Sequence, residues 1–203
     1  MNAAVICGAF NPVTKAHIHM GLLVKETLHV DKVIYVPAAE SFLKSWKQYE
    51  KDDIFSNEER LKFLQSAITP YEYMEVNDIE IKSGELKTYQ LLCKIKEQYR
   101  YNEIYFVVGT DKIPELKTWY RSMDLLKEFH LVVISRNEDP YKTILENPFV
   151  WIFRKNIICI SNKQEDSVFS STQLRIAIRE KDKVTIEKIF PDECIKLLTK
   201  GKG

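Results

Sequence analysis

Two side chains near the start of the chain, Thr14 and His17, have the types and the spacing of a phosphate-binding site. They lie three positions apart where a helical pattern begins, so both project from one face of its first turn. A short apolar run at 3–7 and then Gly8 precede them, which predicts a strand, a glycine turn and a helix in succession. Such a turn aims backbone N–H groups and a helix N-terminus at a ligand above the strand, and this arrangement suits phosphate.

A second polar segment lies near the other end of the chain, where Ser170, Ser171 and Thr172 are followed by Arg175. Either serine can cap the helix that follows, and an exposed arginine on a capped helix needs no functional explanation. The functional interpretation is a second helix N-terminus that binds phosphate, with the arginine one turn later as the charge. Taken singly, the earlier threonine and histidine are equally consistent with a plain N-cap and a structural histidine. The joint pattern favours function.

The first of these segments resembles a signature of the nucleotidylyltransferase superfamily, G-x-F-x-P-x-T-x-x-H over residues 8–17. The usual form ends in H-x-G-H or T-x-G-H, and this chain has Ala16 in place of that glycine. The family's eukaryotic mononucleotide adenylyltransferases also lack it. Residues 169–175 resemble the second signature, I-S-S-T-x-x-R, with Phe169 in place of isoleucine. Two such signatures in the expected order identify the chain as similar to this superfamily.

The middle of the chain narrows the resemblance to the mononucleotide adenylyltransferases that make the NAD skeleton. Five segments carry this resemblance. They are a helix start with E-x-R-L at 56–64, D-x-E with a later threonine at 78–88, and G-T-D with a later tryptophan at 109–119. The other two are an apolar strand that ends in Ser-Arg at 131–136 and a Pro-Asp pair at 191–192. The match is weakest at 37–44, where the bacterial nicotinate-type enzymes usually carry P-x-x-x-P-P-H-K. Of that pattern's last four residues this chain keeps only Lys44, which is also consistent with a solvated lysine.

The resemblance implies a reaction and a set of site residues. AMP would pass from ATP to nicotinate mononucleotide, giving the deamido dinucleotide and pyrophosphate, with Mg²⁺ accompanying ATP and no metal held by the protein alone. The implied catalytic residues are His17, Thr14 and Arg175. The residues implied to bind ATP are Gly8, Ala9, Phe10, Ser170, Ser171 and Thr172. The residues implied to bind the mononucleotide are Lys44, Thr88, Asp111, Trp119 and Arg136.

Three alternatives to this function stay open. Nicotinamide mononucleotide could be the preferred or an equal substrate. Phosphopantetheine adenylyltransferase and the cytidylyltransferases carry the same two signatures, but they lack the D-x-E and G-T-D segments in this arrangement. A non-catalytic nucleotide sensor is disfavoured, because all the charged catalytic positions are present.

Continuous β-branched runs alternate with amphipathic helices, which predicts a mostly parallel sheet covered on both faces. We therefore expect a single Rossmann-like α/β domain over residues 1–203. Strands are expected at 3–7, 33–36, 74–81, 103–108, 131–134 and 157–160. Helices are expected at 14–28, 56–68, 88–99, 123–128 and 171–180, with another after Pro191. We expect a loop at 38–55, and at 137–148 a loop with room for one short helix.

Composition excludes several classes of function. The chain has 30 basic and 29 acidic residues and a formal net charge of +1, so nothing favours binding to a nucleic acid backbone. We find neither an apolar stretch of signal-peptide type nor one long enough to span a membrane. The four cysteines form no C-x-x-C pair, which predicts reduced thiols, no structural zinc and a cytoplasmic protein. No exposed apolar helix face stands out, so the sequence leaves the oligomeric state open.

Overall fold

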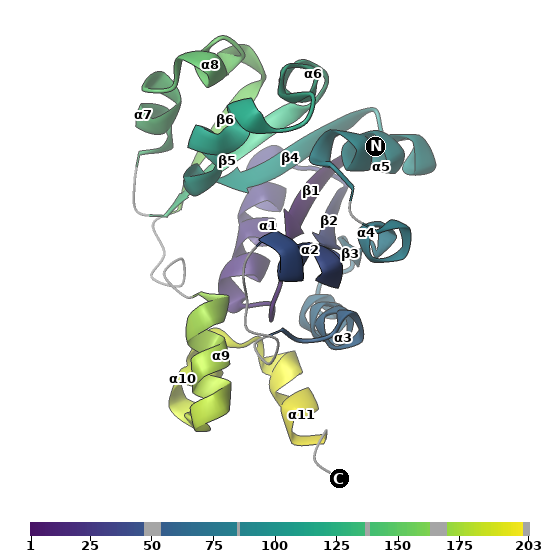
Figure 1. Ribbon diagram of the computed structural model, residues 1–203, viewed down its shortest axis with the longest axis vertical. Helices are drawn as coiled ribbons and strands as arrows, with labels where there is room; N and C mark the ends of the chain where they lie inside the picture. Colours follow the sequence, from purple (N-terminus) through teal and green to yellow (C-terminus); the bar gives the residue numbers. More distant parts are fainter. Residues whose placement is uncertain (47–53, 85, 137–138, 163–169, 201–203) are drawn as a thin grey trace.

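The computed structural model describes residues 1–46, 54–84, 86–136, 139–162 and 170–200. The described strands form one six-stranded sheet in the order β3-β2-β1-β4-β5-β6, and all neighbouring strands are parallel. Their bounds are β1 Asn2–Gly8, β2 Lys32–Pro37, β3 Met74–Val76, β4 Glu103–Gly109, β5 His130–Arg136 and β6 Ile157–Asn162. The chain moves outward from β1 to β3, then returns to place β4 beside β1 (Figure 1). This is the doubly wound order of a Rossmann-type sheet.

Helices cover both faces of the sheet, as the alternating pattern predicts. One hydrophobic core is shared by α1 (Lys15–Leu28), α3 (Asn57–Ile68), α9 (Ser171–Glu180), α10 (Lys183–Ile189) and α11 (Asp192–Lys200). The other is shared by α5 (Thr88–Tyr99), the 3₁₀ helix η2 (Thr110–Thr118), α6 (Ser122–Glu128), α7 (Pro140–Leu145) and α8 (Pro148–Trp151). Strand β1 alternates between the cores, with Ala3 and Val5 in the second and Ala4 and Ile6 in the first.

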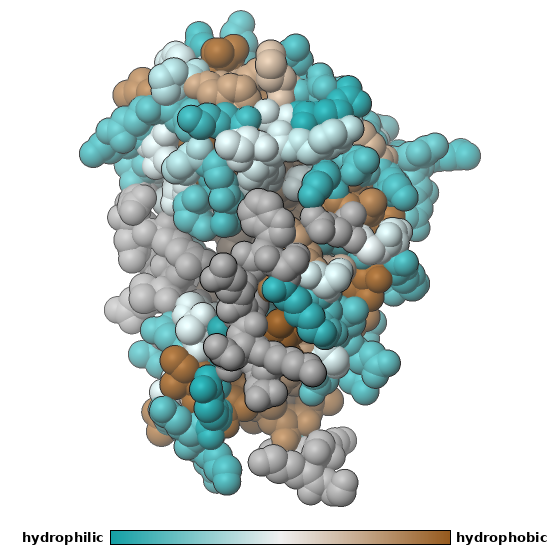
Figure 2. Space-filling view, viewed as in Figure 1, coloured by the Kyte–Doolittle hydropathy of each residue, from teal (hydrophilic) through white to brown (hydrophobic). Residues whose placement is uncertain are grey.

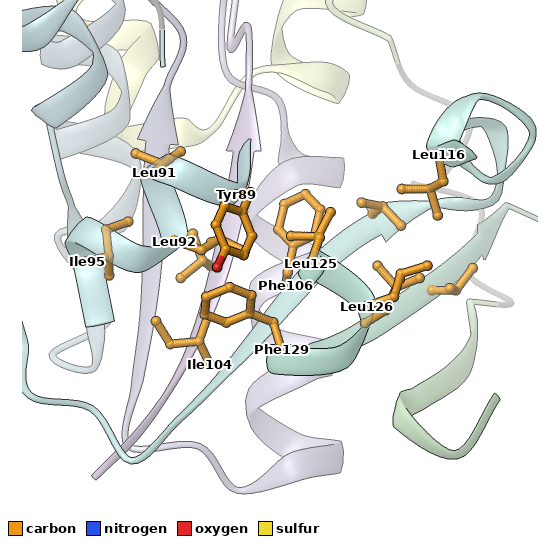
Figure 3. Close-up of a cluster of buried hydrophobic side chains, with 14 of the residues drawn as sticks. Tyr89, Leu91, Leu92, Ile95, Ile104, Phe106, Leu116, Leu125, Leu126 and Phe129 are labelled. Carbon is orange, nitrogen blue, oxygen red and sulfur yellow. The ribbon is translucent and has the colours of Figure 1, made fainter. Parts of the chain in front are cut away.

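The core beneath α5 and α6 holds the end of β4 in place. Figure 3 shows Tyr89 and Leu92 of α5 beside Phe129 and the β4 side chains Ile104 and Phe106. The aliphatic members of this group are at most 1% exposed. Because burying one such apolar side chain contributes about 1.5–3 kcal/mol, this packing fixes the strand that leads to Gly-Thr-Asp.

Two expected elements differ in the structure. The segment expected as a loop at 38–55 contains a short helix, α2 (Glu40–Trp46). It forms because the Ala39 carbonyl begins a helical turn, accepting from the backbone N–H groups of Phe42 (3.0 Å) and Leu43 (3.3 Å). The fully buried Leu43 side chain anchors it. Residues 47–53 of that expected loop lie outside the described residues.

The strand expected at 74–81 is also shorter than predicted. It ends at Val76, and α4 (Ile79–Ser83) follows. The reason is a local turn, in which Asn77 Oδ1 accepts from the Ile79 backbone N–H at 2.9 Å and diverts the chain out of the sheet. The apolar positions change phase at the same point, from Met74 and Val76 to Ile79 and Ile81, which an uninterrupted strand would not allow.

Near the C-terminus the chain has more helix than predicted. Helix α10 was not predicted, and it begins where Asp182 Oδ1 accepts from the Thr185 backbone N–H (3.2 Å). The expected loop at 137–148 has one helix, α7, and begins a second, α8; each has a capping side chain and a proline in its first turn. The 3₁₀ turn η3 (Arg154–Asn156) leads into β6.

The surface in Figure 2 is mostly hydrophilic, with apolar residues scattered among polar ones. The exposed apolar side chains include Leu145, Trp151 and Ile152, at the ends of α7 and α8. None of the helices in the described part of the chain has the length and hydropathy of a membrane span.

Candidate active site

The topology of the sheet places its switch point between β1 and β4, because the chain runs outward from these two strands in opposite directions. In open α/β sheets, ligands bind beyond the carboxyl ends of the strands at that point. Here these ends are Gly8 and Gly109. The turn at 9–14 follows the first and η2 follows the second, so both predicted ligand-binding segments begin at this edge.

Thr14 and His17 form one hydrogen-bonded unit at the start of α1. The Thr14 backbone N–H donates to His17 Nδ1 at 3.1 Å, and Thr14 Oγ1 lies 2.8 Å from the same nitrogen. A backbone N–H can only donate, so Nδ1 is an acceptor and the neutral imidazole carries its proton on Nε2. Thr14 is fully buried and His17 is half-buried. The pair therefore presents an Nε2–H donor, which suits a phosphate oxygen.

The second signature packs directly against the first. Ser171 Oγ donates to the Pro12 carbonyl at 2.8 Å, across 159 positions of sequence. Arg175 Nη1 donates to the Asn11 carbonyl at 2.8 Å, and Nη2 donates to Thr172 Oγ1 at 3.3 Å. The N-termini of α1 and α9 thus meet at one turn of the backbone, where the guanidinium of Arg175, a residue only 7% exposed, adds positive charge. Two helix N-termini and an arginine at one place are suited to binding a polyphosphate.

Helix α9 begins with a complete capping box. Ser170 Oγ accepts from the Gln173 backbone N–H at 3.2 Å, and Gln173 Oε1 accepts from the Ser170 N–H at 2.9 Å. Phe169, which precedes this cap, lies outside the described residues.

Three further candidates, Asp111, Trp119 and Thr88, lie on the α5 side of the sheet. The carboxylate of Asp111 folds back over Gly109, so a Cβ at position 109 would collide with Asp111 Oδ1. Asp111 is exposed and pairs with Lys112 at 3.5 Å. Trp119 follows η2, is half-buried, and has its ring centroid 6.0 Å from that of Phe106. Thr88 is the first residue of α5 and is half-buried.

The remaining two candidates for the mononucleotide site are Lys44 and Arg136. Lys44 is an exposed residue of α2, and its ammonium pairs with Glu40 of the same helix at 2.5 Å. Arg136 is the last residue of β5, in register with Asn162 of β6. The side chain of Arg136 lies outside the described part of the protein.

Sequence reasoning did not single out two buried residues that contact the site. Arg60 of α3 is fully buried and donates to the Ala9 carbonyl at 2.6 Å. Tyr35 of β2 donates its hydroxyl proton to the His17 carbonyl, with an O···O distance of 3.1 Å. The available signal was weak, because an arginine inside a helix is normally exposed and a tyrosine in a strand is normally a packing residue. The E-x-R-L pattern marked Arg60 only as part of a resemblance.

Three comparisons place the chain among known proteins. A model of the family described as cytidylyltransferase-like matches residues 5–177. A protein of Fusobacterium nucleatum, named probable nicotinate-nucleotide adenylyltransferase, is 30% identical over 204 residues, which cover 96% of this chain and 100% of the relative. A protein of Clostridium botulinum with the same name is 30% identical over 200 residues, covering 96% and 93% of the two chains.

The fold has counterparts among solved structures. Nicotinic acid mononucleotide adenylyltransferase of Plasmodium falciparum, complexed with APC, superposes with a TM-score of 0.73 at 20% identity, covering 97% of this chain and 95% of that one. A putative nicotinate-nucleotide adenylyltransferase of Vibrio parahaemolyticus superposes with a TM-score of 0.65 at 19% identity, covering 98% of each chain. These matches confirm the predicted α/β nucleotidylyltransferase fold.

Proposed function

The chain belongs to the cytidylyltransferase-like family, and we propose that it transfers AMP from ATP to nicotinate mononucleotide, forming the deamido dinucleotide and pyrophosphate. One structural observation supports this function above the others. The hydrogen bonds from Ser171 to Pro12 and from Arg175 to Asn11 join two distant segments into one site suited to phosphate. Relatives that match nearly the whole chain carry this activity in their names, and the Plasmodium protein was also solved complexed with NaAD.

The reaction needs little covalent chemistry from the protein. An oxygen of the mononucleotide phosphate, already anionic at neutral pH, forms a bond to the α-phosphorus of ATP. The bond from that phosphorus to the bridging oxygen of the β-phosphate breaks, and pyrophosphate leaves with the electron pair. No general base is required. Catalysis therefore depends on holding two phosphates in line and on stabilising the charge that develops between them.

We assign the charge-stabilising roles to the joined turn. His17 would donate from Nε2 to an oxygen of the α-phosphate, because Nδ1 is already engaged by Thr14. Arg175 and the first turn of α9, with Ser170, Ser171 and Thr172, would hold the β- and γ-phosphates. The backbone of Gly8, Ala9 and Phe10 would line the junction between the two substrates.

Mg²⁺ would accompany ATP in this site. Across the described ranges of the chain, no three His, Cys, Asp or Glu side chains gather to hold a metal ion. We expect the ligands of the ion to be mainly phosphate oxygens and water, as is common for Mg²⁺ with nucleotides. When bound, the ion would neutralise charge on the triphosphate, and the residues at 8–17 would position the reacting phosphorus.

The mononucleotide would lie on the other side of the junction. The flat ring of Trp119 suits stacking against a pyridine ring. Thr88 and Asp111 would supply polar contacts, with further contacts from Arg136 and Lys44. Lys44 would first have to leave its ion pair with Glu40.

Pyrophosphate release in the presence of ATP and Mg²⁺ tests this function, with nicotinate and nicotinamide mononucleotides compared in parallel. We expect a large preference for the nicotinate form in kcat/KM. Equal rates, or a preference for the amide, would mean that the chain serves the alternative substrate and that its altered segment 38–44 accepts it. Absence of release with both substrates would contradict the pyridine assignments of Thr88, Asp111 and Trp119.

A further inference from the structure

Arg60 is a fully buried charged side chain whose observed hydrogen-bond partners are neutral. Its guanidinium donates from Nη1 to the Ala9 carbonyl (2.6 Å) and from Nη2 to the Ala38 carbonyl (2.7 Å) and to Asn57 Oδ1 (2.6 Å). Its Nε is buried without a hydrogen-bond partner in the part of the chain that the structure describes. Buried arginines are rare and normally paired, because desolvating a charge is costly. This one therefore calls for an explanation beyond packing.

The acceptors of Arg60 lie at the functional edge of the sheet. Ala9 follows β1 and Ala38 follows β2, and the two strands end in register at Gly8 and Pro37. The Ala38 backbone N–H also donates to the Gly8 carbonyl at 2.9 Å. One guanidinium thus ties together the two turns at the carboxyl ends of neighbouring strands. The first of these turns is the one that carries the phosphate-binding signature.

Holding the Ala9 carbonyl sets the direction of the next N–H group. In a planar trans peptide the C=O of one residue and the N–H of the next point in opposite directions. Because the Ala9 carbonyl points at the buried guanidinium, the Phe10 N–H points away from it. Phe10 has a φ of 42°, in the left-handed region that a bulky residue seldom adopts. Such a backbone conformation persists only where its surroundings enforce it.

Three further carbonyls at this turn are held in the same way. The Gly8 carbonyl accepts from the Ala38 N–H, the Asn11 carbonyl from Arg175, and the Pro12 carbonyl from Ser171. Donors from other parts of the protein therefore engage four carbonyls at this turn, counting that of Ala9. Since the Thr14 N–H already donates to His17 Nδ1, the Phe10 N–H is the natural contact for an anionic ligand here.

The charge of Arg60 lies directly behind the same turn. Burial lowers the pKa of its guanidinium, while the carboxylates of Glu40 and Glu80 raise it. An arginine keeps its proton under these conditions. In a poorly solvated interior its positive charge acts over a longer distance than a surface charge would.

We propose that Arg60 is a positioning residue for adenylyl transfer, which fixes the Ala9 carbonyl so that the Phe10 N–H faces the triphosphate. Through Ala38 it also sets the spacing between this turn and the one that follows β2. The proposal rests on the proposed function, since it assigns this residue a part in the same phosphate site. Arg60 touches neither substrate and acts through the backbone.

Arg60→Lys separates this role from general stabilisation. Lysine keeps the charge, but a single ammonium on a flexible stem cannot reproduce the fixed fork that spans two carbonyls and an amide. We expect kcat to fall about 100-fold, because small misplacements of reacting groups cost on the order of 10²-fold. The Kd of a non-hydrolysable ATP analogue should rise about 10-fold through the lost alignment of the Phe10 N–H.

A matched control measures loss of stability alone. Val30 is 1% exposed and lies just before β2, at the opposite end of that strand from Pro37. Val30→Ala should lower the melting temperature without changing kcat per folded molecule. An Arg60→Lys variant that melts earlier but keeps kcat and the analogue's Kd within about twofold of wild type would overturn the proposal, since such changes lie within 0.4 kcal/mol.

A second pair of variants keeps the test available if Arg60→Lys does not fold. Asn57 Oδ1 accepts from Arg60 and from the Glu40 backbone N–H (3.1 Å). Asn57→Ala removes one anchor of the guanidinium and should lower kcat about 10-fold, whereas Asn57→Asp keeps an acceptor and should recover much of that loss. Equal activity of the two variants would overturn the proposal.

Failure of the proposed function can be told apart from failure of this inference. If the wild-type protein released no pyrophosphate with either mononucleotide, the ATP analogue alone would still test Arg60. A 10-fold rise in its Kd in Arg60→Lys would support the positioning role, and an unchanged Kd would overturn it.

Discussion

The turn after β1 and the segment after β4 meet at the same edge of the sheet, but they are held in different ways. The carbonyl groups of the first turn accept hydrogen bonds from Arg60, Ser171 and Arg175, which lie far away in sequence. Two of these donors are at most 7% exposed. The first turn is thus held by buried polar contacts that leave its backbone little freedom.

The segment after β4 carries its candidate residues on less constrained side chains. Asp111 is exposed and Trp119 is half-buried against one face of the apolar core. The difference suits the two tasks of the site. The reacting phosphates require a fixed geometry, whereas the binding of a ring tolerates small side-chain adjustments. Changes in the first region should therefore lower kcat, and changes in the second should raise KM.

The largest expected effect is that of His17→Ala, at the centre of the constrained region. Removing one preorganised donor to the transition-state charge should lower kcat by about 10³-fold. The fold should persist, and the Kd of an ATP analogue should change less than about 10-fold, since the proposed phosphate contacts of the first turn of α9 would remain. Pyrophosphate release measures kcat, and thermal unfolding measures whether the fold persists. Turnover like that of wild type would remove His17 from the mechanism.

Arg175→Lys should have the next largest effect. Lysine keeps the charge but cannot donate to the Asn11 carbonyl and Thr172 Oγ1 together, so kcat should fall about 100-fold. Arg179→Lys is the matched control, because Arg179 is an exposed residue one turn later on the same helix. Equal activities for the two variants would contradict a constrained site at the α1–α9 junction.

A third prediction concerns the support beneath His17. The Tyr35 hydroxyl occupies the space that a Cβ at Gly21 would need. Gly21→Ala should lower the free energy of unfolding by about 2 kcal/mol, as overpacking commonly does. Tyr35→Phe in the same chain should recover part of that loss. Denaturant unfolding of both single variants and the double variant measures the coupling, and strictly additive losses would argue against it.

The fourth prediction tests the less constrained region. Trp119→Leu should raise KM for nicotinate mononucleotide about 10-fold, because an aromatic pair contributes about 0.5–1.5 kcal/mol beyond its buried area. kcat should change little. Trp151→Leu on α8 is the control, since that ring is 41% exposed and carries no proposed role. A loss confined to kcat would mean that this region is as rigidly coupled to the chemistry as the first.

The smallest effect is expected for Lys44→Ala. Its observed contact is an exposed ion pair with Glu40, and such pairs contribute about 0.2–1 kcal/mol. KM for the mononucleotide should therefore change less than about threefold. Steady-state kinetics at saturating ATP give this value. A tenfold rise would mean that Lys44 leaves its ion pair with Glu40 and contributes strongly to mononucleotide binding, which would make α2 a major part of that site.

Local sequence patterns were sufficient to predict most of the helices and strands. The parallel sheet was predicted, and α1, α3, α5 and α9 begin and end within one residue of the helices predicted at 14–28, 56–68, 88–99 and 171–180. Each has a clear period and a capping or terminating signal. The errors have two different causes. Helix α2 depends on burial of Leu43, which is a tertiary contact. The end of β3 depends on the local turn at Asn77, a signal that the apolar spacing over 74–81 outweighed in the prediction.

The sequence by itself determined the two segments that we propose bind phosphate and the strands that precede them, since these depend on residue types at short spacings. Only the tertiary structure decided how the segments meet. The bond from Ser171 to Pro12 and the burial of Arg60 join residues that no periodicity connects. A buried arginine and an exposed one look alike along a chain, because the difference is made by the carbonyls that fold around it.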